Sequence, residues 1–183
     1  MASLDNVKDG IDVLVIVDVQ VDFTTGSLGN ELAASKVETI VEKAKHFDGI
    51  VMLTRDSHPA EYLESQEGHL LPVEHCIEGT SGIEFDGGLE DLAAERGWQV
   101  YAKPTFGSVQ LAQDLVKLNE KTPIRSIELI GFCTDICVVS NALLIKAHLP
   151  EVPIKVDGDL CAGVTPETHD AALTTMRSCQ IAC

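Results

Sequence analysis

The most constraining feature of this sequence is a regular alternation between short apolar runs and longer segments with a helical period. The first run, residues 12–17, reads Asp-Val-Leu-Val-Ile-Val and is rich in β-branched residues. Such a run is typical of a strand buried on both faces, and strands of that kind belong to parallel sheets. Further runs that predict strands lie at residues 50–54, 99–102, 126–130, 152–156 and 179–182.

Helical patterns separate these runs. The clearest covers residues 31–46, where apolar side chains recur at helical spacing. Further helices are predicted at residues 89–96, 109–119, 141–147 and 165–177, the last with Thr165 as its N-cap and Pro166 at its first position. The alternation predicts a three-layer α/β/α fold with a mainly parallel sheet of about six strands. Because the chain has 183 residues, we expect residues 1–183 to form a single domain.

Composition excludes several classes of function. The net charge is −16, and no basic patch or Lys/Arg-rich helix is visible, so we expect neither nucleic acid nor an anionic membrane as a partner. No apolar run has the length of a membrane span, and residues 1–10 contain no signal-peptide core. Without such a signal, six cysteines indicate reduced thiols and a cytoplasmic protein.

One stretch combines a strand end, a cysteine and a helix start. Residues 131–138 read Gly-Phe-Cys-Thr-Asp-Ile-Cys-Val, so Cys137 is predicted to lie in the first turn of a helix. There, free N–H groups and the helix dipole favour a thiolate and can bind a developing oxyanion. Thr134 or Asp135 is expected to cap the helix. The alternative is an inert buried cysteine, which is the usual state of a free thiol.

Functional sites of open α/β sheets lie beyond the carboxyl ends of the strands. Asp18, Asp56, Lys103 and Cys137 each follow a predicted strand. Asp18, Lys103 and Cys137 should face one crevice as a base for the thiol proton, an orienting cation and a nucleophile. Taken one by one, they could instead be a loop residue, a surface cation and a core thiol.

A second group of polar residues suits a metal ion. Asp56 and His58 are two residues apart on an extended segment, so their side chains can point the same way, and His69 and His75 follow. A carboxylate and two imidazoles suit a divalent transition ion with open positions. His69 and His75 lie within a long irregular stretch, residues 59–88, of the kind that is usually functional, and Asp56 and His58 lie just before it. The alternative is a polar loop with scattered histidines.

Three segments resemble the motifs of isochorismatase-like cysteine hydrolases. They are residues 13–23, 103–108 and 131–138, and they occur in the order of that family. Residues 56–59 and 72–80 are also similar to the metal-binding segments of nicotinamidases. The resemblance implies an isochorismatase-like, Rossmann-like fold with strand order 3-2-1-4-5-6. It also implies a cis peptide between Phe132 and Cys133, which turns the Cys133 N–H toward the same oxyanion as the Cys137 N–H.

The resemblance further implies one divalent metal ion, zinc, iron or manganese, held by Asp56, His58 and His75, with His69 only a neighbour. In such enzymes the metal binds the pyridine nitrogen of nicotinamide. Nicotinamidases often carry tryptophan at the positions of Leu71 and Ser57, so the aromatic pocket is reduced here. The substrate contacts expected in this chain are Phe23, Leu71 and Phe106.

The function expected from this resemblance is that of a nicotinamidase, which hydrolyses nicotinamide to nicotinate and ammonia through a cysteine thioester in NAD salvage. The nearest alternative is the same catalytic set acting on another small amide, a carbamoyl compound or a ureido compound. Isochorismate hydrolysis uses no cysteine nucleophile, so Cys137 argues against it. A non-catalytic binding protein is the alternative of a different class. We also expect a homo-oligomer with a small-molecule amide as substrate.

Overall fold

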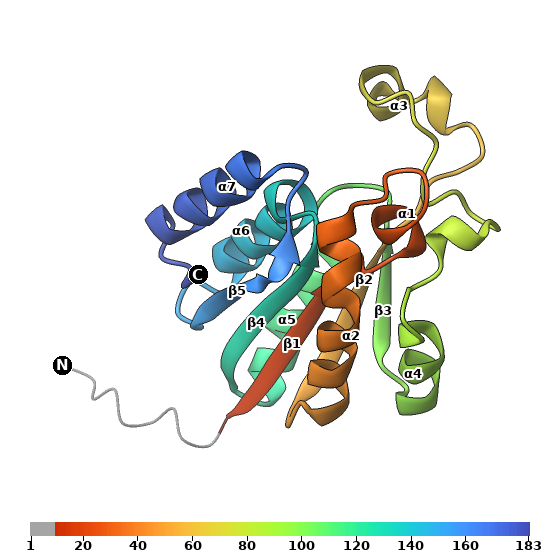
Figure 1. Cartoon of the computed structure of the whole chain (residues 1–183). Coiled ribbons are helices and arrows are strands. Elements are labelled where there is room, and N and C mark those ends of the chain that lie inside the picture. Colours follow the sequence, from red (N-terminus) through yellow and green to blue (C-terminus); the bar gives the residue numbers. More distant parts are fainter. Residues whose placement is uncertain (1–9) are drawn as a thin grey trace.

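The computed structural model describes residues 10–183, in which five strands form one parallel sheet in the order β3-β2-β1-β4-β5 (Figure 1). The strands are β1 (Ile11–Val17), β2 (Ile50–Asp56), β3 (Gln99–Lys103), β4 (Ile124–Phe132) and β5 (Ile154–Ala162). The parallel arrangement and the order of these five strands are as expected. The stretch before residue 10, in which we found no signal-peptide core, lies outside the described residues.

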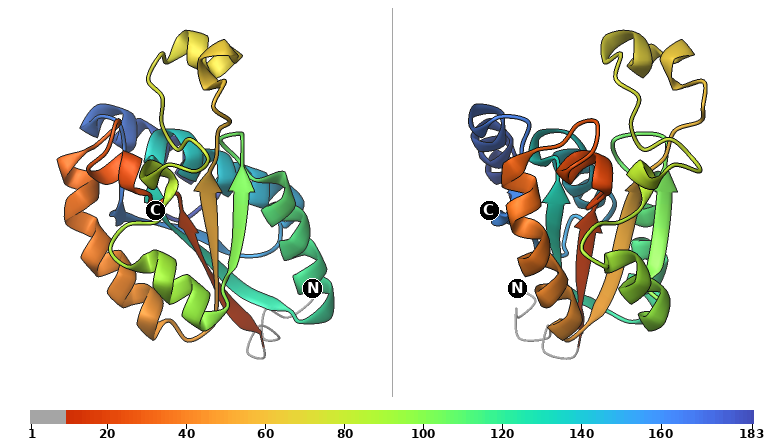
Figure 2. Two further views of the ribbon diagram at one scale, coloured as in Figure 1. Left: turned by 90° about the vertical axis from the view of Figure 1, so that its right-hand side faces the viewer. Right: turned by 45° about the vertical axis from the view of Figure 1, so that its right-hand side comes forward.

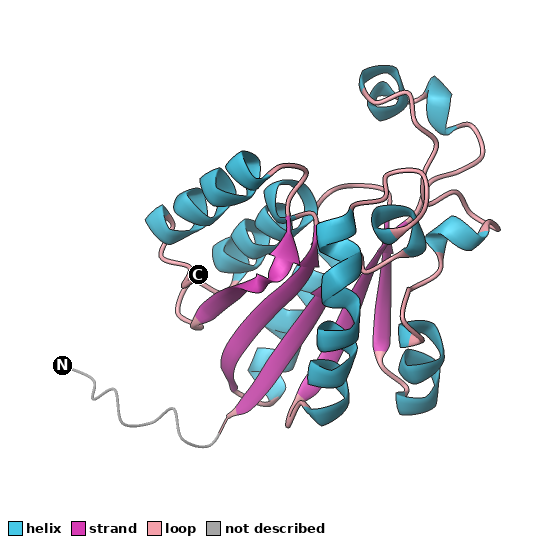
Figure 3. Ribbon diagram, viewed as in Figure 1, coloured by secondary structure: helices cyan, strands magenta, loops and turns pink. Residues whose placement is uncertain are grey.

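Helices cover both faces of the sheet, as Figures 2 and 3 show. Leu14 and Ile16 of β1 pack with α2 (Glu31–His46) and α4 (Leu89–Arg96). The alternate residues of β1, such as Val15, pack on the other face with α5 (Val109–Lys121), α6 (Val139–His148) and α7 (Pro166–Ser178). Because successive side chains of a strand point to opposite faces, a continuous apolar run fills two cores. The three-layer fold is confirmed.

The predicted sixth strand is wrong. Residues 179–182 make only one isolated parallel bridge, between Lys155 and Ala182. The N–H groups of residues 179–181 bond back to carbonyls in the last turn of α7, and Gln180 has a φ of +64°. The chain therefore reverses direction at the helix end and leaves too few extended residues to pair along β5.

The fifth strand was predicted at residues 152–156, but β5 extends to Ala162. Its ladder with β4 is irregular between Leu129 and Gly131 and resumes at the pair Gly131–Cys161. The irregularity accommodates Asp157 and Gly158, which lie beyond the end of the predicted strand and are residue types that strands disfavour.

The long stretch between β2 and α4 lies at the carboxyl end of the sheet. It contains η2 (Tyr62–Glu64), α3 (Gln66–Leu70) and η3 (Ser81–Ile83), and the part with α3 projects above the strands (Figures 1 and 2). The short α1 (Val21–Thr24) follows β1 at the same end. This end therefore carries the segments that can surround a site. None of the helices described is long and apolar enough to cross a membrane.

Candidate active site and metal centre

Lys103, the last residue of β3, brings the predicted catalytic residues together. Its Nζ atom lies 2.7 Å from Oδ2 of Asp18 and 3.4 Å from Sγ of Cys137. Nζ also lies 3.4 Å from Oδ1 of Asp56, at the end of β2. All four side chains are at least nine-tenths buried. The strand-end residues that we singled out therefore do converge at one place.

Cys137 lies in a π-helical turn, η4 (Thr134–Val138), which connects β4 to α6. The Phe132–Cys133 peptide bond is cis, as the resemblance implied. The Cys133 carbonyl accepts hydrogen bonds from the N–H groups of Ile136 and Val138. The segment thus places Cys133 and Cys137 on the wall of the same cavity.

The expected cap of this helix start is wrong. Thr134 Oγ1 lies 2.8 Å from Nδ1 of His169 on α7, and Asp135 Oδ1 accepts from the N–H of Val164 at 3.1 Å. Both side chains therefore bond to the C-terminal part of the chain, and neither caps η4 or α6. A Thr or Asp side chain at a helix start can accept hydrogen bonds from local N–H groups, but here hydrogen bonds to distant residues replace those local bonds.

Burial decides the charge of the nucleophile. Burial, followed by the charge of Asp18, raises the pKa of Cys137 well above the value of a free thiol. Desolvation therefore outweighs the opposing charge of Lys103. The resting nucleophile is a thiol, and it needs a base to remove its proton.

Asp18 is suited to that role. Burial raises the pKa of Asp18, and the charge of Asp56 acts in the same direction, while Lys103 and a 2.6 Å hydrogen bond from Thr54 Oγ1 oppose them. Burial alone would lower the pKa of Lys103, but the charges of Asp18 and Asp56 outweigh it and raise that pKa. Lys103 therefore stays charged while Asp18 can accept and return a proton.

The predicted metal ligands also come together. Asp56, His58 and His75 are buried, and their ligand atoms all lie within 4.8 Å of one another. Asp56 Oδ2 is 3.1 Å from His58 Nε2 and 3.5 Å from His75 Nε2. Burial alone would raise the pKa of Asp56, but hydrogen bonds from both histidines and the charge of Lys103 hold it well below its usual value. His69 is exposed and outside this group.

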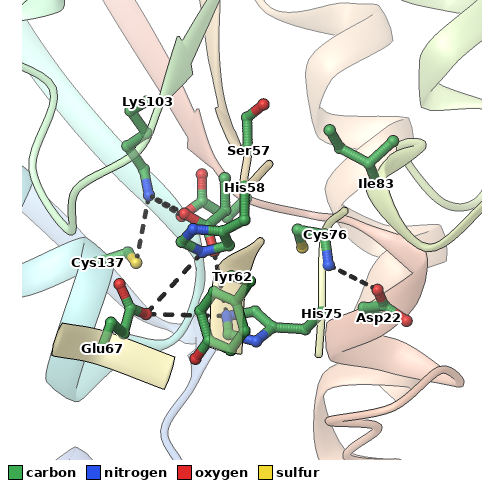
Figure 4. A network of polar contacts seen from close by, with 12 residues as sticks. Asp22, Ser57, His58, Tyr62, Glu67, His75, Cys76, Ile83, Lys103 and Cys137 are labelled. Carbon is green, nitrogen blue, oxygen red and sulfur yellow. Dashed lines mark hydrogen bonds and ion pairs between the residues drawn. The ribbon is translucent and has the colours of Figure 1, made fainter. Parts of the chain in front are cut away.

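Two residues of this site were missed in the sequence. Glu67 on α3 places Oε1 3.9 Å from Nε2 of both His58 and His75 (Figure 4). Tyr62 is buried, its ring centroid lies 4.8 Å from that of His58 and 5.0 Å from that of His75, and its hydroxyl donates to the Leu71 carbonyl. Ser65 caps α3, and a serine at this position could have predicted the start of the helix that carries Glu67.

Two side chains that follow β1 hold the segments carrying these ligands. Gln20 Nε2 donates to the Asp56 carbonyl at 2.9 Å, and Gln20 Oε1 accepts from the Asp56 N–H at 2.8 Å. Asp22 accepts from the N–H of Cys76, next to His75, at 2.7 Å (Figure 4). Neither contact was predicted, because each joins residues far apart in the chain.

A cavity of about 870 Å³ opens over both groups. Its wall includes Asp56, His75 and Cys137, together with the three expected substrate contacts, Phe23, Leu71 and Phe106. Phe23 is buried and meets the edge of the His75 ring, whereas Leu71 and Phe106 are partly exposed. A small molecule in this cavity can therefore reach the Cys137 thiol and the His75 imidazole at the same time.

Comparisons with known proteins agree with this geometry. The profile of the isochorismatase domain matches residues 12–183. The nicotinamidase/pyrazinamidase of Mycobacterium tuberculosis is 29% identical over 181 residues, covering 92% of this chain and 95% of that protein. The crystal structure of the Bacillus subtilis nicotinamidase/pyrazinamidase PncA has a TM-score of 0.76 and 26% identity, covering 94% of this chain and all of that one.

The pyrazinamidase of Pyrococcus horikoshii, solved in complex with zinc, shares the fold, with a TM-score of 0.73 and 24% identity over 93% of this chain and 97% of that one. The similarities extend over nearly the whole described chain and include the segments that carry Asp18, Lys103 and Cys137. On this evidence the chain is a member of the isochorismatase family.

Proposed function

We propose that this protein is a metal-dependent cysteine amidohydrolase that converts nicotinamide and water to nicotinate and ammonia. One observation carries the proposal: Lys103 Nζ contacts Asp18 and Cys137 beside the group Asp56, His58 and His75, in one cavity. A thiol, a base of raised pKa and a fixed cation can perform nucleophilic catalysis. The nicotinamidase/pyrazinamidase relatives support the choice of amide.

Catalysis begins when Asp18 takes the proton of the Cys137 thiol. The sulfur then attacks the amide carbonyl carbon, and the carbonyl electron pair moves to the oxygen, which the N–H groups of Cys133 and Cys137 stabilise. As the tetrahedral species collapses, the C–N bond breaks and Asp18 gives its proton to the leaving ammonia. Water, deprotonated by Asp18, cleaves the thioester and releases nicotinate and the thiol. Lys103 remains charged and orients both partners.

The donor set fits a divalent metal ion. An anionic carboxylate and two imidazoles face one another, and Glu67 offers a fourth donor on the cavity side. When bound, such an ion supplies an open position for a pyridine nitrogen and thereby orients the ring. We propose Asp56, His58, His75 and Glu67 as its holders and zinc, iron or manganese as its identity. The zinc complex of the Pyrococcus horikoshii protein is compatible with this choice.

Ammonia release from nicotinamide and benzamide tests the proposal, because benzamide has the same shape but no ring nitrogen. We expect much faster hydrolysis of nicotinamide and a divalent metal in the purified protein. His75→Ala should reduce nicotinamide turnover and leave the small rate on benzamide little changed. Equal rates on the two amides, or full activity without metal, would contradict the proposal and indicate a general amidase.

The second candidate is the same chemistry on another small amide, a carbamoyl compound or a ureido compound. It is favoured by Leu71, which lines the cavity and is 37% exposed. Nicotinamidases often carry tryptophan at this position, so the cavity lacks an aromatic contact for the ring there. A panel of such compounds, scored for ammonia release beside nicotinamide, separates the two. Cytoplasmic location and a homo-oligomeric state stay predictions.

A further inference from the structure

The cavity wall has a buried part and a part that is open to solvent. Asp56, His75 and Cys137 are each no more than 5% exposed and form its floor. Four large apolar side chains line the same cavity and are open to solvent, and we call them its mouth: Leu70, Leu71, Phe106 and Val164, with exposed fractions of 80%, 37%, 47% and 57%. The polar residues Ser27, Gln66 and Thr105 are also exposed along the wall.

This mouth is built from three separate segments of the chain. Leu70 and Leu71 end α3, Phe106 lies between β3 and α5, and Val164 follows β5. Other large apolar side chains exposed in the described part lie outside the cavity wall, namely Leu32, Leu63 and Val109. Apolar side chains gathered at one opening from several segments indicate a binding surface, whereas single exposed ones are ordinary.

The cavity is also larger than nicotinamide requires. With about nine non-hydrogen atoms, nicotinamide fills no more than roughly a third of the 870 Å³, even if each atom takes the ~30 Å³ of a water molecule. The volume lies near the upper end of the roughly 300–1,000 Å³ that bury larger ligands. The remaining space extends from the floor to the apolar mouth.

We infer that the substrate class of this site includes pyridine carboxamides with an apolar substituent, which the mouth binds. The inference rests on the proposed function. In nicotinamide, one ring carbon lies between the ring nitrogen and the carbon that carries the carboxamide. If the nitrogen and the carboxamide both face the floor, the ring carbon on the opposite side of the ring points to the mouth. A substituent at that carbon meets Leu70, Phe106 and Val164, and it displaces water from apolar surface.

The test compares nicotinamide with its methyl, propyl and pentyl derivatives, alkylated at this carbon. Each buried methylene should raise kcat/KM by about threefold to fourfold. The hydroxyethyl derivative has the size of the propyl one, and it should lose that gain. Leu70→Ser and Val164→Ser should each reduce the ratio of kcat/KM for the pentyl derivative to that for nicotinamide. Leu32→Ser, an exposed leucine outside the cavity, is the matched control and should leave the ratio unchanged.

The outcomes distinguish the inference from the function on which it rests. A series that is flat or falls with chain length, on an enzyme that hydrolyses nicotinamide, overturns the inference and leaves the proposed function intact. If the protein hydrolyses neither nicotinamide nor its alkyl derivatives, the proposed function itself is wrong. A flat series combined with a changed subunit count for Leu70→Ser, measured by light scattering, would assign the mouth to a second copy of the chain instead.

Discussion

The side-chain amide of Gln20 forms two hydrogen bonds with the main chain of Asp56, one to its carbonyl and one from its N–H. Gln20 lies two residues beyond Asp18, and Asp56 is the last residue of β2. The contact therefore joins the segment with the proposed base to the segment with the proposed metal ligands. It fixes one relative to the other, as a site with two reacting groups requires.

Gln20→Leu tests this contact. The substitution leaves a buried N–H and a buried carbonyl of Asp56 without their partner, which costs about 1–3 kcal/mol of unfolding free energy. We expect a lower urea midpoint and a lower metal content in the purified protein. Gln99→Leu is the control, because Gln99 is exposed and, within residues 10–183, its side chain bonds only to the neighbouring Val100 carbonyl. Equal effects of the two substitutions would contradict the role of Gln20.

Cys137→Ala should abolish amide hydrolysis and leave the fold intact, because it removes the nucleophile and only one buried sulfur atom. Ammonia release and circular dichroism measure the two properties. Cys179→Ala, at an exposed cysteine, is the control and should keep full activity. Cys133 contributes only its backbone N–H to the proposed mechanism, so replacement of its side chain should cost less than replacement of Cys137. Turnover by Cys137→Ala near the normal rate would refute the mechanism.

The acid side of the pH–rate profile should report Asp18. Thr54 donates a hydrogen bond to its carboxylate and thereby favours the charged form. Thr54→Val removes that bond and raises the pKa of Asp18 further, so at a given acidic pH less enzyme carries the free base. The acid limb of kcat/KM should therefore move to higher pH.

Thr54→Ser keeps the hydroxyl and serves as the control for this shift. Asp18→Asn should lower the rate at every pH by at least about 10²-fold, the usual loss on removing an acid–base group. An acid limb that stays in place in Thr54→Val would assign the base to another residue.

Lys103→Ala should reduce kcat/KM by at least about 10²-fold, because it removes the cation that orients both Asp18 and Cys137. It also leaves two buried carboxylates without their cation, and breaking a buried pair costs about 3–5 kcal/mol. Urea unfolding measures this loss. Lys117→Ala, at an exposed i,i+3 pair with Asp114, should change neither property. Normal turnover by Lys103→Ala would exclude it from the catalytic set.

Glu67→Ala should lower the affinity for the metal, because it removes the donor that faces both imidazoles. Metal content after dialysis against a graded chelator measures the change independently of turnover. Glu64→Ala, at an exposed glutamate in the same segment, is the matched control. If the two variants retain the metal equally, the proposed ligands are reduced to Asp56, His58 and His75, and Glu67 is only a neighbour of the site.

The local sequence pattern determined much of the fold and of the candidate site. The continuous apolar runs predicted the five central strands, because a strand between two helical layers has no polar face. Parallel strands end at one edge, so the residues after them had to converge, and Asp18, Lys103 and Cys137 do so. The resemblance to a known family supplied the candidate metal ligands and the cis peptide; the three candidate side chains lie together, and the Phe132–Cys133 bond is cis.

Only the tertiary structure decided the partner of each polar side chain and the protonation of the nucleophile. Thr134 had the sequence of a helix cap, yet it pairs with His169, 35 residues away, because α7 packs against η4. Nothing local separates Glu67 from Glu64, and the path of the chain brings one of them to the histidines. The helix start favours a thiolate, but burial acts in the opposite direction and raises the pKa of Cys137. A residue's type and near neighbours set its intrinsic preference, whereas its distant contacts and its access to water arise only when the chain has folded.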